Sequence, residues 1–338
     1  MKQPLLSRFN YLLPWINFVI MCCAAWLRLT QLHTLPPAPY WEEVALGYDA
    51  YSILKTGKDH HGVDMPLVAF ESFGDWKPSG YFYALLPSIA MFGLNVFAVR
   101  FPSVLAGIGL VWLFPAFVAV VLGRKLTPGL ELGARLLAAI SPWLLVFARG
   151  GWEVNLAFFL LVAGCLLWHA ALKKHHQFQF WLYGVGAVLL LVAAMYTYHA
   201  IRLIAPLWAI LFTLQSINLT TWKKAWLALI GKLMLLAGIA LILLLPILQQ
   251  LQSPVITQRF QETSILSDPQ PVLLSNQLRA EHGNTWWARL IYHRYWFIAT
   301  KITSNYFDHL RLDYLFVHGD ANARHRGPLY GQLLYPDA

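Results

Sequence analysis

The segment FPSVLAGIGLVWLFPAFVAVVL, residues 101–122, decides the fold class, because it carries no charge and is long enough to cross a bilayer. A helix needs about 20 consecutive apolar residues for that crossing. A second segment of this kind, AWLALIGKLMLLAGIALILLLPIL at 225–248, contains a single lysine. Both segments indicate helices that use lipid as their solvent.

The composition extends this conclusion to the whole chain. Hydrophobic residues make up 58% of it and charged residues 12%, whereas soluble domains carry about 25% charged residues. So few polar groups cannot cover a globular surface, which excludes a cytosolic enzyme, a disordered chain and a collagen. The apolar residues form runs rather than alternating, which excludes an outer-membrane barrel. We therefore expect an all-α polytopic membrane protein.

Apolar runs and loop charges together predict the topology. We expect about seven spanning helices, which lie at 11–32, 101–122, 134–148, 154–172, 180–196, 203–217 and 225–248. The run 80–92 is too short to span, so we expect it to lie along the membrane surface. The basic pairs Arg124-Lys125, Lys173-Lys174 and Lys223-Lys224 then all face the cytoplasm, as does the N-terminus.

This topology divides the chain at residue 248. Residues 1–248 form a transmembrane module with a first outer loop at 33–100. Residues 249–338 form a polar region on the outer face, where the aromatic residues between 286 and 296 indicate interfacial helices. An uncleaved first helix is favoured over a signal peptide, because no small-residue cleavage site follows it. The expected location is the plasma membrane.

The net charge of +9 has two interpretations. It is typical of nucleic-acid binding in a soluble protein, but the basic residues here lie in loops between spans, where they orient the chain in the bilayer. We therefore expect a lipid bilayer and no nucleic acid as partner. The cysteines all lie inside apolar spans and show no disulfide or zinc spacing.

Ionisable side chains gather on the predicted outer face. They come from the first outer loop, from two turns between spans and from the tail: Glu42, Glu43, Asp75, Lys77, Arg149, Glu153, Tyr198, His199, Arg202 and Asp320. Arg149 and Arg202 depart from the positive-inside pattern, and ionisable groups at membrane depth are often functional. Taken singly, each also fits a snorkelling side chain, and Arg149 with Glu153 fits an intrahelical ion pair.

This mixture of charges fits transfer of a group from a lipid-linked phosphate. A carboxylate takes a proton from the attacking hydroxyl as general base, and Lys or Arg neutralises the departing phosphate. Since neighbours on a helix do not share a face, only one of Glu42 and Glu43 can face the hydroxyl. A solvated acidic turn is the other interpretation of this pair. The sequence Lys77-Pro78 suits the start of a helix.

Several stretches resemble bacterial members of glycosyltransferase family 39, which are GT-C membrane enzymes related to protein O-mannosyltransferases and lipid A aminoarabinose transferases. The stretches are PYWEEVALGYDAYS (39–52), TGKD (56–59), FGDWKP (73–78), VRFPS (99–103), SPW (141–143), FAR (147–149), YTYH (196–199) and GD (319–320). They cover almost the whole chain in the expected order. They are specific together rather than singly.

The resemblance implies a GT-C-like bundle that moves a sugar, with inversion, from a polyprenyl-phosphate donor to an acceptor hydroxyl on the outer face. It implies that Glu42 is the base, at a position where the family usually has aspartate, with Glu43 beside it. It assigns Lys77 to the donor phosphate and matches Arg149 to an arginine of the family. From the charges on the predicted outer face, we expect Arg149 or Arg202 to be the second cation that binds this phosphate.

Asp75, Glu153, Tyr198, His199 and Asp320 are expected to support this site. Two local departures from the family pattern are Pro78-Ser79-Gly80, where Pro-Pro-Leu is common, and Ala148, where a serine is common. The family also has more spanning helices, so we expect a chain truncated at its C-terminus.

Other function classes remain open at this point. A transporter or flippase for lipid-linked or anionic substrates would use the same cations, but internal symmetry and mid-membrane charges are not evident. A scaffold subunit without chemistry is a third interpretation. The acceptor hydroxyl belongs to a protein, a lipid or a glycan.

No cofactor is expected, although a divalent metal is left open. Histidines and carboxylates cluster at 59–64 and 318–325, but without HExxH or CxxC spacing they indicate solvated loops.

Overall fold

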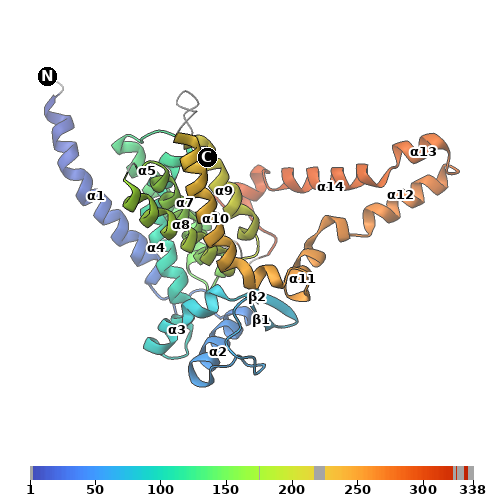
Figure 1. The fold of residues 1–338 in the computed structure, drawn as a ribbon, viewed down its shortest axis with the longest axis horizontal. Helices are drawn as coiled ribbons and strands as arrows, with labels where there is room; N and C mark the ends of the chain where they lie inside the picture. Colours follow the sequence, from blue (N-terminus) through green and yellow to red (C-terminus); the bar gives the residue numbers. More distant parts are fainter. Residues whose placement is uncertain (1–2, 175, 217–224, 323–324, 326–330, 334–338) are drawn as a thin grey trace. The chain divides into compact units, whose positions relative to one another are not determined.

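The computed structural model describes residues 3–174, 176–216, 225–322, 325 and 331–333. Almost all of its regular structure is helical (Figure 1). The chain divides into two units, residues 1–249 and 250–336, where the sequence predicted modules of 1–248 and 249–338. The predicted cytoplasmic pair Lys223-Lys224 lies outside the described residues.

The first unit holds the helices that are long and apolar enough to cross a membrane. In the described part of the chain there are five: α1 (Gln3–Leu29, with the apolar part from Tyr11), α4 (Val96–Val121), α7 (Glu153–Leu172), α8 (Gln177–Thr197) and α10 (Ala225–Gln249). A bent pair, α5 (Pro128–Ile140) and α6 (Pro142–Ala148), brings the number to six when taken as one span. The expected all-α architecture of apolar helices is confirmed.

Two of the seven predicted spans differ from the structure. The segment predicted at 134–148 is not one straight helix, because it bends by 51° between α5 and α6. The segment predicted at 203–217 corresponds to α9 (Ile201–Ser216), whose 16 described residues fall short of the length of the other spans. Length and composition thus support five or six crossings among the described residues, rather than seven.

The outer surfaces of these helices are apolar. Leu207 and Leu211 of α9 are 59% and 56% exposed, and Met234 and Ile242 of α10 are both 67% exposed. Soluble proteins rarely expose large contiguous apolar patches. Such surfaces are typical of helices that face lipid.

The bend between α5 and α6 follows from Pro142. Proline has no N–H, so the carbonyl of Ala138, four residues earlier, loses its helical donor. Arg28 of α1, which is fully buried, donates to the carbonyls of Ala138 at 3.1 Å and Ala139 at 3.0 Å. The guanidinium thereby replaces the missing N–H and fixes α1 against the break.

At one end of the bundle, the segment between α1 and α4 forms a small module (Figure 1). It consists of α2 (Trp41–Thr56), the strands β1 (Ala69–Ser72) and β2 (Asp75–Pro78), and α3 (Gly80–Phe92). Its hydrophobic core contains residues of α2, β1 and α3, which pack against the start of α4 (Val96–Val121). The core residues are Leu46, Ala50, Ile53, Phe70, Tyr81, Phe82, Leu85, Ile89, Ala98 and Val99. The short helix predicted at 80–92 is confirmed; the two strands were not expected.

The strands β1 and β2 pair antiparallel through a tight turn. Ser72 pairs with Asp75, and the turn residues Phe73 and Gly74 have φ values of 54° and 74°. Positive φ at both central positions is typical of the type I′ turn, whose twist matches that of paired strands. Because side chains two apart on a strand share a face, the turn places Asp75 and Lys77 together.

The second unit consists of short helices. They are α11 (Pro254–Thr263), α12 (Gln270–Glu281), α13 (Trp286–Ile291) and α14 (Arg294–Asp308), with brief 3-10 and π turns at Ile265–Ser267 and Asp313–Val317. Trp286 is 80% exposed and Trp296 is 63% exposed. Helices with exposed aromatics agree with the predicted interfacial segment, whose contact with lipid stays a prediction.

We expect Arg28→Met to destabilise the bundle, because two buried carbonyls lose their donor. An unsatisfied buried polar group costs about 1–3 kcal/mol. Unfolding in detergent, followed by circular dichroism, measures this loss. In a Pro142→Ala background the same change should cost less, because position 142 then offers an N–H to Ala138. An equal cost in both backgrounds would show that Arg28 does not act through the break.

Candidate functional site

The first turn of α2 places two adjacent glutamates in different surroundings. Glu43 is buried, whereas the side chain of Glu42 is 27% exposed. Successive residues of a helix point about 100° apart, so the two carboxylates diverge. The site therefore uses them differently, as the helix geometry predicted.

Glu43 forms a buried, bidentate ion pair with Arg100 of α4. Nε of Arg100 donates to Oε1 at 2.8 Å and Nη2 donates to Oε2 at 3.1 Å. The backbone N–H of Gly151 donates to Oε1 at 2.7 Å, and that of Tyr40 donates to Oε2 at 3.2 Å. With four donors, this carboxylate is held as a structural anion.

Arg100 also fixes the segment between α1 and α2. The fully buried guanidinium donates to the carbonyls of Leu32 at 2.9 Å, Pro36 at 3.0 Å and Ala38 at 3.3 Å. Arg100 lies in the stretch 99–103 that carries the family resemblance, but it was not predicted to be a site residue. A charge directly before the run 101–122 was the available signal, because it departs from the positive-inside pattern.

Glu42, Lys77 and Asp75 come together as the sequence predicted for a site. Nζ of Lys77 lies 2.8 Å from Oε1 of Glu42 and 3.0 Å from Oδ2 of Asp75. The lysine side chain is 14% exposed. Burial lowers the pKa of Lys77, but the hydrogen bonds and charges of Glu42 and Asp75 outweigh it and raise the pKa above its ordinary value. The lysine is therefore a cation held between two carboxylates.

The turn between α8 and α9 lies against β2. Nε2 of His199 is 3.0 Å from the carbonyl oxygen of Trp76, the residue before Lys77. A Cβ at Gly80, directly after β2, would lie 2.2 Å from Oγ1 of Thr197, so only glycine permits this approach. Tyr198 lies in the same turn, as the C-cap of α8. These contacts bring the predicted residues of the turn to the Lys77 side of the module.

Arg149 satisfies backbone carbonyls. Its guanidinium donates to Leu27, to Thr30 at 2.8 Å and to Leu35 at 3.1 Å. The last carbonyls of a helix lack donors within the helix, so Arg149 caps the end of α1. No hydrogen bond of the described structure joins it to Lys77 or Glu42.

Arg202, in the first turn of α9, is placed differently. Its Nε donates to the carbonyl of Met195 at 3.2 Å, and its Nη2 is buried without a hydrogen-bond partner in the described structure. The backbone N–H of Arg202 bonds to the carbonyl of His199 at 3.1 Å. Arg202 therefore lies within one helical turn of the residue that contacts β2.

Glu153 is the first residue of α7, whereas Arg149 is the C-cap of the preceding helix, α6. The break at Gly150 and Gly151 separates them, so they do not form the i, i+4 pair of a single helix. The ring of Tyr40 stacks on Trp152 at 4.6 Å, beside Glu153. Burial raises the pKa of Tyr40, and the charges of Glu153 and Glu43 raise it further. Tyr40 thus stays a protonated donor to the carbonyl of Gly151, at 3.4 Å.

The remaining predicted groups form local contacts. Asp320, in the second unit, lies 3.1 Å from Nδ1 of His325 and accepts from the N–H of Asn322. Between α1 and α4, buried Asp49 lies 2.6 Å from Nδ1 of His60. His60 was predicted to belong to a solvated loop at 59–64, and its contact with Asp49 was not expected. In the part of the chain that the structure describes, no group of three or more His, Cys, Asp or Glu is arranged to hold a metal ion.

Comparison with known proteins assigns no family to this arrangement. No protein-family model, curated protein or solved structure matches the chain. The site is therefore defined by its own geometry, and the likeness of its motifs to glycosyltransferase family 39 stays a prediction.

The two neighbouring glutamates make a matched pair for a stability test. Glu43→Gln leaves Arg100 buried without its counter-charge, which typically costs about 3–5 kcal/mol. Glu42→Gln removes a partly exposed carboxylate and leaves Lys77 paired with Asp75, so we expect a smaller loss of about 1 kcal/mol. Thermal unfolding of both variants in one detergent measures the difference. Equal losses would contradict the structural role of Glu43.

The raised pKa of Lys77 predicts a pH dependence. A lysine that binds its proton more tightly when folded stabilises the fold below its ordinary pKa of 10.5. That stabilisation is lost as the pH rises through the higher, folded pKa. We expect the difference in Tm between the native chain and Lys77→Gln to stay constant from about pH 7 to the ordinary lysine pKa. Above that value the difference should shrink, and a difference that instead grows would contradict the ion pair.

Proposed function

We propose that this chain belongs to a membrane glycosyltransferase that moves a sugar from a polyprenyl-phosphate donor to an acceptor hydroxyl. The observation that carries the proposal is the contact of Glu42 with Lys77, at 2.8 Å, with Asp75 behind the lysine at 3.0 Å. It unites a reachable carboxylate, which takes a proton, with a cation, which binds a phosphate. Both groups lie in the module outside the apolar spans.

The surroundings of the two glutamates support Glu42 as the base. The oxygens of Glu43 already accept four hydrogen bonds, so its lone pairs are occupied. A general base needs an open approach to the hydroxyl within hydrogen-bond distance. Glu42 offers this approach, since it is partly exposed and its described ion pair involves only Oε1.

The transfer proceeds as a single displacement. The acceptor oxygen forms a bond to the anomeric carbon while the bond from that carbon to the phosphate oxygen breaks. The hydroxyl proton passes to Glu42, and the phosphate leaves with the bonding electron pair. Lys77 stabilises the negative charge that develops on the phosphate. The donor and the acceptor balance the step between them, so no oxidant or reductant is required.

Donor binding would exchange the partners of Lys77. The phosphodiester of the donor carries one negative charge, as a carboxylate does, and it gains a second as the sugar leaves, so its charge-assisted hydrogen bond to Lys77 strengthens during transfer. When the phosphate takes the place of Glu42 on Lys77, the carboxylate is released to accept a proton. Asp75 keeps its contact and holds the ammonium in position. The described ion pair is thus the resting state of the site.

The two predicted arginines differ in how well they suit the phosphate. Arg149 directs its guanidinium to three carbonyls, whereas Arg202 has a buried Nη2 with no partner in the described residues. A buried donor without a described partner is costly and is available to an anion. This supports Arg202 over Arg149 as the second cation for the donor phosphate.

We expect Glu42→Gln to lower sugar transfer by about a hundredfold to ten-thousandfold, the usual contribution of a general base. The assay follows labelled sugar from a panel of polyprenyl-phosphate sugars in membrane vesicles that contain the chain and its acceptors. Glu71→Gln removes a nearby partly exposed carboxylate of β1 and should leave transfer unchanged. Undiminished transfer by a folded Glu42→Gln variant would remove Glu42 from the base role.

A further inference from the structure

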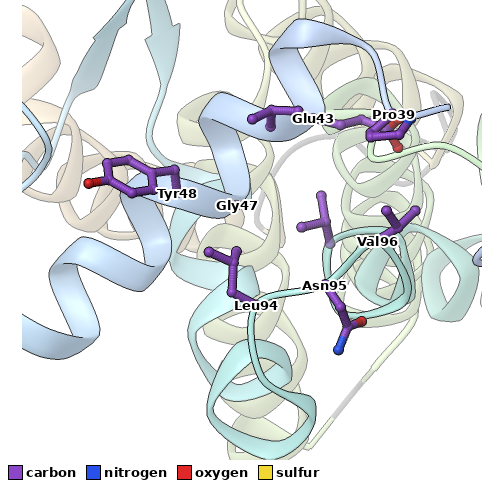
Figure 2. A pocket seen from close by; sticks show the side chains of 9 residues that line it. Pro39, Glu43, Gly47, Tyr48, Leu94, Asn95 and Val96 are labelled. Carbon is purple, nitrogen blue, oxygen red and sulfur yellow. The ribbon is translucent and has the colours of Figure 1, made fainter.

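A pocket lies between the first half of α2 and the segment that leads from α3 into α4 (Figure 2). Its volume is about 190 Å³. Its wall is formed by Pro39, Glu43, Val44, Gly47, Tyr48, Leu94, Asn95, Val96 and Val99. A Cβ at Gly47 would lie 2.6 Å from Cγ2 of Val99, so glycine permits the close approach of α2 to α4.

The carboxylate of Glu43 and the amide of Asn95, two polar groups of the lining, are bonded elsewhere. The carboxylate of Glu43 is held by Arg100 and two backbone N–H groups. The amide of Asn95 accepts from the N–H of Ala98 at 2.9 Å and donates to the carbonyl of Phe92 at 2.7 Å. Water enters a cavity when it finds several polar partners there, and apolar cavities of about 150 Å³ stay dry and bind hydrocarbons. The pocket is therefore suited to a hydrocarbon ligand.

This pocket is separate from the ion-paired site. At about 100° per residue, Val44, Gly47 and Tyr48 lie roughly half a turn around α2 from Glu42. Glu42 faces Lys77 and Asp75, whereas the pocket opens on the other side of the helix. A ligand bound by Lys77 and a ligand in the pocket are thus two different molecules, or two distant parts of one.

The rim of the pocket continues into an exposed apolar surface. Val44, Tyr48 and Leu94 are 55%, 53% and 45% exposed. Val96 is the first residue of α4, one of the helices long and apolar enough to span, and Met91 near the end of α3 is 74% exposed. The mouth therefore lies at the start of a helix that is long and apolar enough to span, a position that we expect hydrocarbon chains of a bilayer to reach.

We propose that this pocket binds one acyl chain of a bilayer phospholipid. A few methylene groups fill about 190 Å³, close to the size of an apolar cavity that accepts benzene. The rest of the chain and the headgroup remain in the bilayer, because the pocket is open on one side. The bound chain packs between α2 and α4 and holds the helix that carries Glu42 on the membrane.

Photo-crosslinking tests the proposal on the full chain reconstituted in phosphatidylglycerol vesicles. The probe is a phosphatidylglycerol with a diazirine in one acyl chain, and mass spectrometry locates the crosslinks. We expect peptides containing residues 44–48 and 94–99 to be labelled more strongly than the exposed apolar surface of α10. Val44→Trp fills the mouth and should lower this labelling about tenfold. This is the loss of affinity expected when the apolar contact area of one side chain is no longer available to the acyl chain.

Leu54→Trp provides the matched control, because it adds the same indole at a 40% exposed position of α2 outside the pocket. Its labelling should equal that of the native chain, and both variants should unfold at the native temperature. Unchanged labelling in Val44→Trp, or equal labelling of all lipid-facing helices, would overturn the proposal. Labelling only by a diazirine polyprenyl phosphate, or crosslinks only between two copies of the chain, would also overturn it.

Discussion

The buried ion pair of Glu43 and Arg100 is the interaction on which the rest of the module depends. Removing two charges from water is costly, and a buried pair tolerates this cost only when every remaining lone pair and proton is satisfied. Here the carboxylate accepts from Arg100, Gly151 and Tyr40, and the guanidinium donates to three carbonyls of the segment before α2. The pair therefore joins α2, α4, the turn before α7 and the end of α1.

Fixing Glu43 also fixes what the other faces of α2 present. Its neighbour Glu42 is directed to Lys77, and Gly47 is pressed against Val99 on the side of the apolar pocket. A polar site and an apolar pocket thus share one short helix, whose orientation is set by the residue between them. A substitution of Glu43 should alter both the polar site and the apolar pocket. A substitution of Glu42 should alter only the polar site, and a substitution of Val44 only the pocket.

Features that depend on the composition of many consecutive residues could be predicted from the sequence. Spans such as 154–172 and the short helix 80–92 need only a run of apolar side chains, and the structure places helices there. The role of Arg100 depends on contacts with residues more than fifty positions away, which no local pattern records. The bend at Pro142 was missed because the prediction weighed hydropathy and not the lost N–H. The pairing of Glu42 with Lys77 was anticipated as a shared site, but not as a direct contact.

The arginines that depart from the positive-inside pattern have a common physical explanation. Between α1 and α2 the chain is irregular, and its carbonyls lack the donors that a helix provides. Arg149 and Arg100 supply donors to Thr30, Leu32, Leu35, Pro36 and Ala38. Arg28 does the same for the break beside Pro142. An arginine on the predicted outer side is therefore not sufficient evidence of an anion site, because backbone carbonyls bind the same donors. Lys77 differs from all three in that its described polar partners are carboxylates and include no backbone carbonyl, so a phosphate can replace one of them without leaving a buried carbonyl unsatisfied.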